Sequence, residues 1–81
     1  MPDQAVQKPV LIVYAVFDHP MDYPTEFIVR RQLVYPGRFT IEPDVWCHAQ
    51  SLEVARASIP SGLVRLPHQP QDPPFLTESW L

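Results

Sequence analysis

The chain has 81 residues, of which 46% are hydrophobic, and a formal net charge of −3 at pH 7. Its length fits one small domain over residues 1–81, and its apolar content excludes an intrinsically disordered chain. The mildly acidic charge argues against a general nucleic-acid-binding protein, because such proteins usually carry a basic surplus.

Three further features of the sequence indicate the cellular compartment. The longest apolar run, residues 10–17, is far shorter than the ~20 residues of a membrane-spanning helix. The first residues lack the basic region and apolar core of a signal peptide. Cys47 is the only cysteine, so no disulfide can form within the chain. We therefore expect a cytoplasmic protein that does not interact with a membrane.

Eleven prolines divide the chain into short elements, because each one lacks an N–H and fixes φ. This pattern favours short strands and excludes a helical bundle. Residues 1–9 are expected to form a flexible N-terminal segment. Residues 10–17 are a continuous β-branched and aromatic run, which predicts a strand covered on both faces. Residues 27–35 predict a second strand that alternates between an apolar and a more polar face.

The middle of the chain predicts a hairpin and a further strand. Pro36 and Gly37 stand where a type II turn requires them, and residues 38–42 alternate as a short return strand. Residues 45–49 predict another strand before the helix.

One helix is predicted, over residues 51–59. Ser51 is a good N-cap, and the apolar residues Leu52, Ala55 and Ile59 form a narrow stripe that fits one side of a sheet. The connection around the helix is long enough for a crossover, so the strands before and after it are predicted to be parallel neighbours.

Two more strands, residues 63–66 and 75–80, are predicted in the C-terminal part of the chain. They are joined by a polar, proline-rich loop over residues 67–74, which is expected to be extended. The predicted fold class is therefore α+β: a single, mostly antiparallel sheet of about five short strands, covered on one face by one short helix.

The C-terminal strand also predicts self-association. Residues 75–81 are apolar and have strong β propensity, so we expect them to lie at an edge of the sheet or to reach across to a neighbouring molecule, with Leu76 and Trp80 on one face. One short helix cannot cover five strands, and the uncovered face then needs a partner. A symmetric homodimer is the expected solution. The alternative is a monomer in which Trp80 closes the core.

The densest polar and aromatic cluster follows the first strand and contains Asp18, His19, Asp22 and Tyr23. Loops at this place often carry function. An aspartate and a histidine can form an acid/base pair or bind a metal. The simpler interpretation is that the aspartates cap turns between prolines. No nucleophile or further ligand has a matching spacing, so no catalytic, cofactor-binding or metal-binding residue is assigned and no cofactor is expected.

Two other groups of residues suggest chemistry less strongly. Cys47 and His48 are adjacent in a predicted strand, so they point to opposite faces and cannot act as a nucleophile and its base. Arg30, Arg31 and Arg38 form the only basic concentration, with aromatic residues between them. A sheet that binds single-stranded nucleic acid needs such rings and cations, although the same aromatics are needed for the core.

Three motifs carry a resemblance to a known set of proteins. They are the Tyr-Ala-x-x-Asp-His-Pro-x-Asp-Tyr-Pro stretch of residues 14–24, the Phe-x-Val-Arg-Arg stretch of residues 27–31, and the Ala-Arg-Ala-x-Ile-Pro stretch of residues 55–60. In these motifs the chain resembles a set of small uncharacterised bacterial and phage-associated proteins. Its ending, residues 77–80, departs from the valine-glutamate-x-tryptophan ending expected of that set. The resemblance implies no activity and transfers no site residues.

The sequence thus predicts a small non-enzymatic binding or accessory protein that acts through contacts with a protein partner or with itself. The alternatives are a nucleic-acid-binding sheet that uses the three arginines, and a small acid/base or metal-assisted enzyme built on the loop of residues 18–22. The candidate interaction residues are Asp18, His19, Asp22, Tyr23, Arg30, Arg31 and Trp80.

Overall fold

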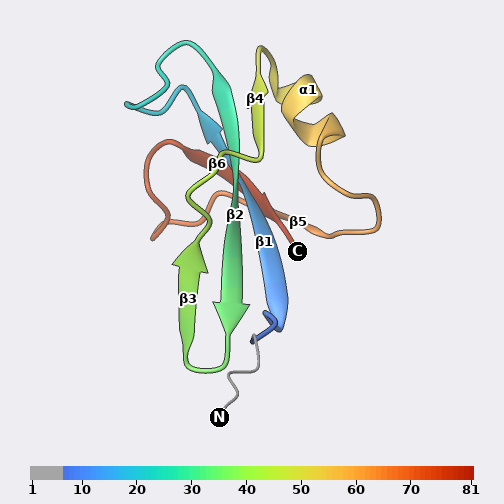
Figure 1. Cartoon of the computed structure of the whole chain (residues 1–81). Helices are drawn as coiled ribbons and strands as arrows, with labels where there is room; N and C mark the ends of the chain where they lie inside the picture. Colours follow the sequence, from blue (N-terminus) through green and yellow to red (C-terminus); the bar gives the residue numbers. More distant parts are fainter. Residues whose placement is uncertain (1–6) are drawn as a thin grey trace.

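A six-stranded antiparallel sheet with one short helix forms the body of the protein (Figure 1). The computed structural model describes residues 7–81. The elements are β1 (Leu11–Asp18), β2 (Phe27–Tyr35), β3 (Arg38–Ile41), β4 (Cys47–Ala49), α1 (Leu52–Ala57), β5 (Arg65–Pro67) and β6 (Leu76–Trp80). The fold is mostly β and broadly α+β, with six strands instead of about five.

The strand order is β3-β2-β1-β6-β5, and β4 pairs with the part of β2 that β3 leaves free. All the pairings are antiparallel, so the predicted parallel crossover around α1 is wrong. After the helix the chain does not return beside β4. Val64 instead exchanges two backbone hydrogen bonds with Leu81, and this places β5 beside β6 at the far end of the sheet.

The C-terminal strand β6 lies between β1 and β5, so the prediction that it forms an edge is wrong. The predicted common face of Leu76 and Trp80 is also wrong. Trp80 lies opposite Tyr14, but the register shifts between Val16 and Phe17, and Leu76 lies opposite Phe17. Because one extra residue in a strand reverses the faces beyond it, Leu76 and Trp80 point to opposite sides.

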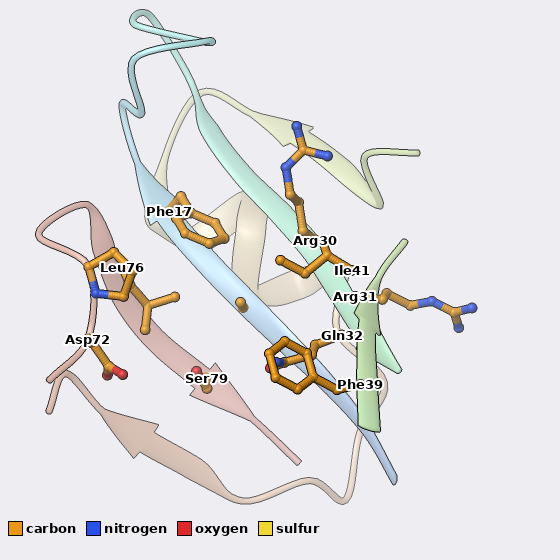
Figure 2. Close-up of a pocket in the computed structure, with 11 residues that line it drawn as sticks. Phe17, Arg30, Arg31, Gln32, Phe39, Ile41, Asp72, Leu76 and Ser79 are labelled. Carbon is orange, nitrogen blue, oxygen red and sulfur yellow. The ribbon is translucent and has the colours of Figure 1, made fainter. Parts of the chain in front are cut away.

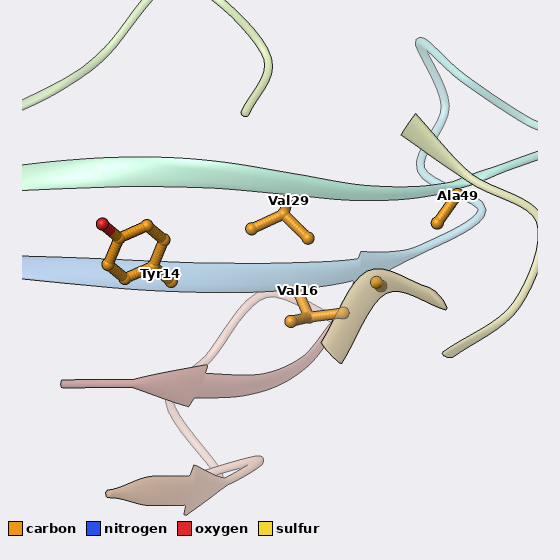
Figure 3. Packing of buried hydrophobic residues seen from close by; sticks show 5 residues of the cluster. Tyr14, Val16, Val29 and Ala49 are labelled. Atoms are coloured by element: carbon orange, nitrogen blue, oxygen red, sulfur yellow. The ribbon is translucent and has the colours of Figure 1, made fainter. Parts of the chain in front are cut away.

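The core lies between the sheet and α1. Val16, Val29 and Ala55 are completely buried there, together with Tyr14 and Ala49 (Figure 3). We call this side of the sheet the helix face. Tyr14 and Val16 are alternate positions of β1, and Val29 lies opposite Val16 on β2, while Ala49 belongs to β4 and Ala55 to α1.

The helix matches its predicted stripe. Ala55 is fully buried, and Leu52 and Ile59 pack against the same cluster. Ser51 is the N-cap, since its Oγ accepts a hydrogen bond from the Val54 N–H at 3.2 Å. The helix ends at Ala57, earlier than the predicted residue 59, in a 3₁₀-type turn: the Ser58 N–H donates to Ala55 O at 3.2 Å and the Ile59 N–H to Arg56 O at 3.1 Å.

The opposite side of β1 is covered only in part by the described residues: Ile28 and Leu76, which both lie opposite Phe17, are buried there. The prediction of a strand buried on both faces is wrong. Ala15 and Phe17 are only half-buried, because the one helix lies on the other side. We call this side the open face. It is formed by alternate residues of β1, β2, β3 and β6, namely Ala15, Phe17, Arg30, Gln32, Phe39, Ile41, Leu76 and Ser79.

Two connections fix the ends of the strands. Gly37 has a φ of +79°, the left-handed value that the predicted type II turn requires. The proline-rich loop is not extended: Asp72 N–H bonds to Gln69 O, and Gln69 N–H bonds to the Asp72 carboxylate, both at 2.9 Å. Of the predicted N-terminal segment, residues 1–6 lie outside the described residues, and Gln7 contacts Arg38.

Candidate functional site

A hollow of about 330 Å³ lies on the open face (Figure 2). Ala15 and Phe17 of β1 and Leu76 of β6 line its centre, and Phe39 and Ile41 of β3 line one side. These five apolar side chains come from three strands, because the pleat sends alternate residues of every strand to this side. The hollow is therefore an apolar surface on a rigid β scaffold.

The two apolar β3 side chains that line the hollow are exposed. Phe39 is 59% exposed and Ile41 57% exposed. Scattered apolar residues are normal on a protein surface, but here they line the same hollow as the half-buried Ala15 and Phe17, with Arg30 and Gln32 of β2 between the two groups. Such an apolar hollow is typical of a surface that contacts another molecule.

Opposite charges lie on two sides of this hollow. The guanidinium of Arg30 lies on one side, where it donates hydrogen bonds to Asp22 Oδ2 at 3.2 Å and to Pro43 O at 3.3 Å. Asp72 lies on the other side, next to β6 (Figure 2). An apolar centre with a polar rim is the usual anatomy of a protein–protein interface.

The predicted cluster in the loop after β1 is divided between different partners. Asp18 and His19 contact each other through Oδ1 and Nδ1, and the His19 ring packs edge-on against Phe27. Asp22 pairs with Arg30 on the open face instead. The Tyr23 ring meets His48 of β4 at 5.1 Å between centroids. The structure thus brings Asp18 and His19 together and places Asp22 and Tyr23 elsewhere.

The three arginines do not share one surface. Arg30 lies on the open face, while the adjacent Arg31 points to the helix face, where it donates two hydrogen bonds to the Glu42 carboxylate at 2.9 and 2.7 Å. The bonds to Glu42 raise the pKa of Arg31, and the bonds from Arg31 lower the pKa of Glu42. The guanidinium carbon of Arg31 also lies 4.9 Å from the centroid of the Trp46 ring. Arg38 stacks on the ring of Tyr35, which lies opposite it across the β2–β3 hairpin.

A buried carboxylate on the helix face was not anticipated from the sequence. Glu78 is fully buried, and four donors saturate its two oxygens. Oε1 accepts from Arg56 Nη2 at 2.7 Å and Arg65 Nε at 2.8 Å, while Oε2 accepts from Arg56 Nε at 2.9 Å and Trp80 Nε1 at 2.7 Å. These bonds, that from Arg56 above all, lower the pKa of Glu78 to about 2.

This cluster explains the position of Trp80, which was a candidate interaction residue. Its indole N–H is used by Glu78, and its ring packs against the core. The signal in the sequence was the two-residue spacing of Glu78 and Trp80, which puts both side chains on one face of β6. Arg56 and Arg65 then connect the helix and the edge strand to that face.

The remaining candidates for chemistry lie apart. Cys47 packs against the core, and His48 points to the other side and meets Glu26 Oε1 at 3.1 Å, so the prediction that they face opposite ways is confirmed. Within residues 7–81, no three His, Cys, Asp or Glu side chains are grouped as metal ligands.

Comparison with known protein families, with curated proteins and with solved structures gives no significant match for this chain. The helix found in residues 7–81 is too short to cross a lipid bilayer.

Proposed function

We propose that this protein is a small non-enzymatic binding or accessory protein that acts through protein–protein contacts on its open face. The observation that carries the proposal is the hollow on the open face, which the half-buried Ala15 and Phe17 line together with the exposed Phe39 and Ile41. Exposed apolar surfaces of this kind are costly in water unless a partner covers them for part of the time.

The charged groups around the hollow favour a protein over a small apolar ligand. Arg30 and Asp72 lie on different sides of the hollow, so a partner with both charges can be oriented as well as held. The hollow is partly open to solvent, whereas small-molecule sites enclose most of their ligand. The contact is therefore proposed to extend over the sheet surface and not into a closed cavity.

The cellular setting is part of the same proposal. A single cysteine, half-buried in β4, suits the reducing cytoplasm. The motifs of residues 14–24 and 27–31 resemble small bacterial and phage-associated proteins, and a partner is to be sought first in such a system.

A pair of matched variants tests this function. Ala15→Glu places a carboxylate in the centre of the hollow, opposite Arg30 in the β1–β2 register, where the fold can accommodate it. Val54→Glu places the same charge on the exposed side of α1, on the helix face. Tagged protein is isolated from its native cells in the three forms.

We expect one protein partner to be recovered at equal amounts with the unchanged protein and Val54→Glu, and to be lost with Ala15→Glu. Equal recovery with all three forms, or no partner with any of them, contradicts the proposal. Circular dichroism of the two variants checks that both remain folded.

A further inference from the structure

In residues 7–81, strand β3 is an edge of the sheet with no second neighbouring strand. It is the terminal strand in the order β3-β2-β1-β6-β5, and among the described residues it pairs only with β2 (Figure 1). All four of its residues are exposed. A bare edge offers a row of backbone N–H and C=O groups to another strand.

The register shows which backbone groups are free. Arg38 lies opposite Tyr35, Thr40 opposite Leu33, and the N–H of Glu42 donates to the carbonyl of Arg31 at 2.9 Å. In an antiparallel pair every second residue directs both its N–H and its C=O to the neighbouring strand. Residues 38, 40 and 42 are therefore bonded to β2, and Phe39 and Ile41 direct their N–H and C=O groups outward.

We propose that two copies of this protein pair antiparallel through their β3 edges, with the two-fold axis at Thr40. In this arrangement Phe39 lies opposite Ile41 of the second copy, and Ile41 opposite Phe39 of the second copy. These residues carry the outward backbone groups, so they form four hydrogen bonds across the axis. No residue of β3 has to change its present backbone pairing.

The side chains of this segment are complementary to themselves. Residues 38–42 read Arg-Phe-Thr-Ile-Glu, so antiparallel pairing about the centre places Arg38 opposite Glu42 of the second copy, twice. The Glu42 carboxylate keeps its two hydrogen bonds from Arg31 of its own chain, so Arg38 adds a second positive charge beside it. Cross-strand pairs of opposite charge and pairs of an aromatic with a β-branched residue stabilise a sheet. The apolar pair lies on the open face, and the charged pair lies on the other side.

The other edges are less suitable. β5 has three residues, and it ends in Pro67, which has no N–H to donate. β4 also has three residues and is followed at once by the helix. β3 contains no proline, and its exposed Phe39 and Ile41 both have strong β propensity.

This inference goes beyond the function proposed above, because it uses the backbone edge of β3 instead of the hollow on the open face. Pairing joins two open faces into one continuous surface across the dimer. The contact is small, so we expect a weak dimer that forms with increasing concentration.

Amide exchange, together with sedimentation, tests the pairing at about 10 µM and about 1 mM protein. We expect the Phe39 and Ile41 amides to exchange fast in the dilute sample and about tenfold more slowly once about nine-tenths of the chains are paired. The Thr40 amide is the internal control, since it bonds to β2 and is protected in both samples. A monomer at both concentrations, or a dimer in which Phe39 and Ile41 still exchange fast, overturns the proposal.

Variants separate this edge from the open face. Phe39→Pro removes one outward donor without removing a bond to β2, and it is expected to give a monomer in which the Thr40 amide stays protected. Arg38→Glu places like charges opposite each other and weakens the dimer, while Lys8→Glu, with the same change of charge outside the strands, does not. Ala15→Glu leaves the dimer intact, so loss of the open-face partner and loss of the dimer are distinguishable. If Phe39→Pro forms a dimer at the same concentrations as the unchanged protein, the proposed pairing is wrong.

Discussion

Replacing Glu78 by glutamine should destabilise the protein strongly, because Glu78 is the only fully buried charged residue in the described part of the chain. Its carboxylate accepts four hydrogen bonds, and three of them come from Arg56 and Arg65. Glu78→Gln keeps the size but removes the charge, and the new amide NH₂ faces groups that can only donate. About half of each arginine side chain remains in water, so the arginines themselves are not left buried.

The magnitude follows from the pKa of Glu78, which falls from an ordinary 4.5 to about 2. Each pH unit corresponds to ~1.4 kcal/mol, so the folded state gains about 3 kcal/mol from this carboxylate at pH 7. A domain of this size is stable by only about 5 kcal/mol. Glu78→Gln should therefore remain folded only marginally at pH 7.

The same reasoning gives a pH dependence. A carboxylate whose pKa is lowered on folding stabilises the protein above its unfolded pKa, and this stability is lost as the pH falls through its folded pKa. As the pH falls from 4.5 to about 2, the free energy of unfolding of the unchanged protein should decrease by about 3 kcal/mol more than that of Glu78→Gln. Glu42, whose pKa is also lowered, contributes equally to both proteins and cancels in the comparison.

Urea denaturation followed by tryptophan fluorescence measures both effects. Glu53→Gln, on the exposed surface of the first helical turn, is the matched control and should change the stability by less than about 0.5 kcal/mol. The reasoning is refuted if the two glutamine variants are equally stable at pH 7, or if Glu78→Gln and the unchanged protein lose the same stability in acid.

Three smaller predictions concern the helix and the β2–β3 turn, and urea denaturation measures each. Leu52→Ala removes a half-buried side chain from the core and should cost about 1–2 kcal/mol, whereas the exposed Val54→Ala should cost less than about 0.5 kcal/mol; equal costs would show that the helix is rotated. Ser51→Ala should cost about 1 kcal/mol through loss of the cap, and no loss would mean that its Oγ makes no bond to Val54. Gly37→Ala should cost about 1–2 kcal/mol although nothing lies near the new methyl group, because φ is +79°; a neutral result would contradict the left-handed turn.

Local pattern predicted much of this fold. The alternation of residues 27–35 marked β2 at its true bounds, and the spacing of Leu52, Ala55 and Ile59 identified the side of α1 that packs on the sheet. The Pro36-Gly37 pair marked the turn, since only glycine accepts that φ without strain. Each of these features depends only on residues close together in the sequence, so the sequence of a single strand, helix or turn is enough to predict it.

Long-range pairing could not be predicted in the same way. The apolar character of β6 fits an edge strand that binds a partner or a central strand, and the sequence does not distinguish the two. The register shift at Val16 and Phe17 is set by two strands far apart in the chain, and it alone moves Leu76 away from the face of Trp80. The two arginines that bind Glu78 also come from separate elements, Arg56 from α1 and Arg65 from β5. The buried cluster can therefore be recognised only once the strands are paired.

Photo-crosslinking in native cells tests the central claim, that the open face makes the protein contact, most directly. A photoreactive phenylalanine analogue is placed at Phe39 on the open face, or at Trp46, a comparably exposed aromatic residue on the helix face. We predict crosslinks from position 39 to a protein other than this one, and none from position 46; crosslinks only to a second copy of this chain would report the β3 pairing and would contradict the open-face claim. Crosslinks from position 46 alone, or equal yields from both positions, would contradict the assignment of the open face as the contact surface.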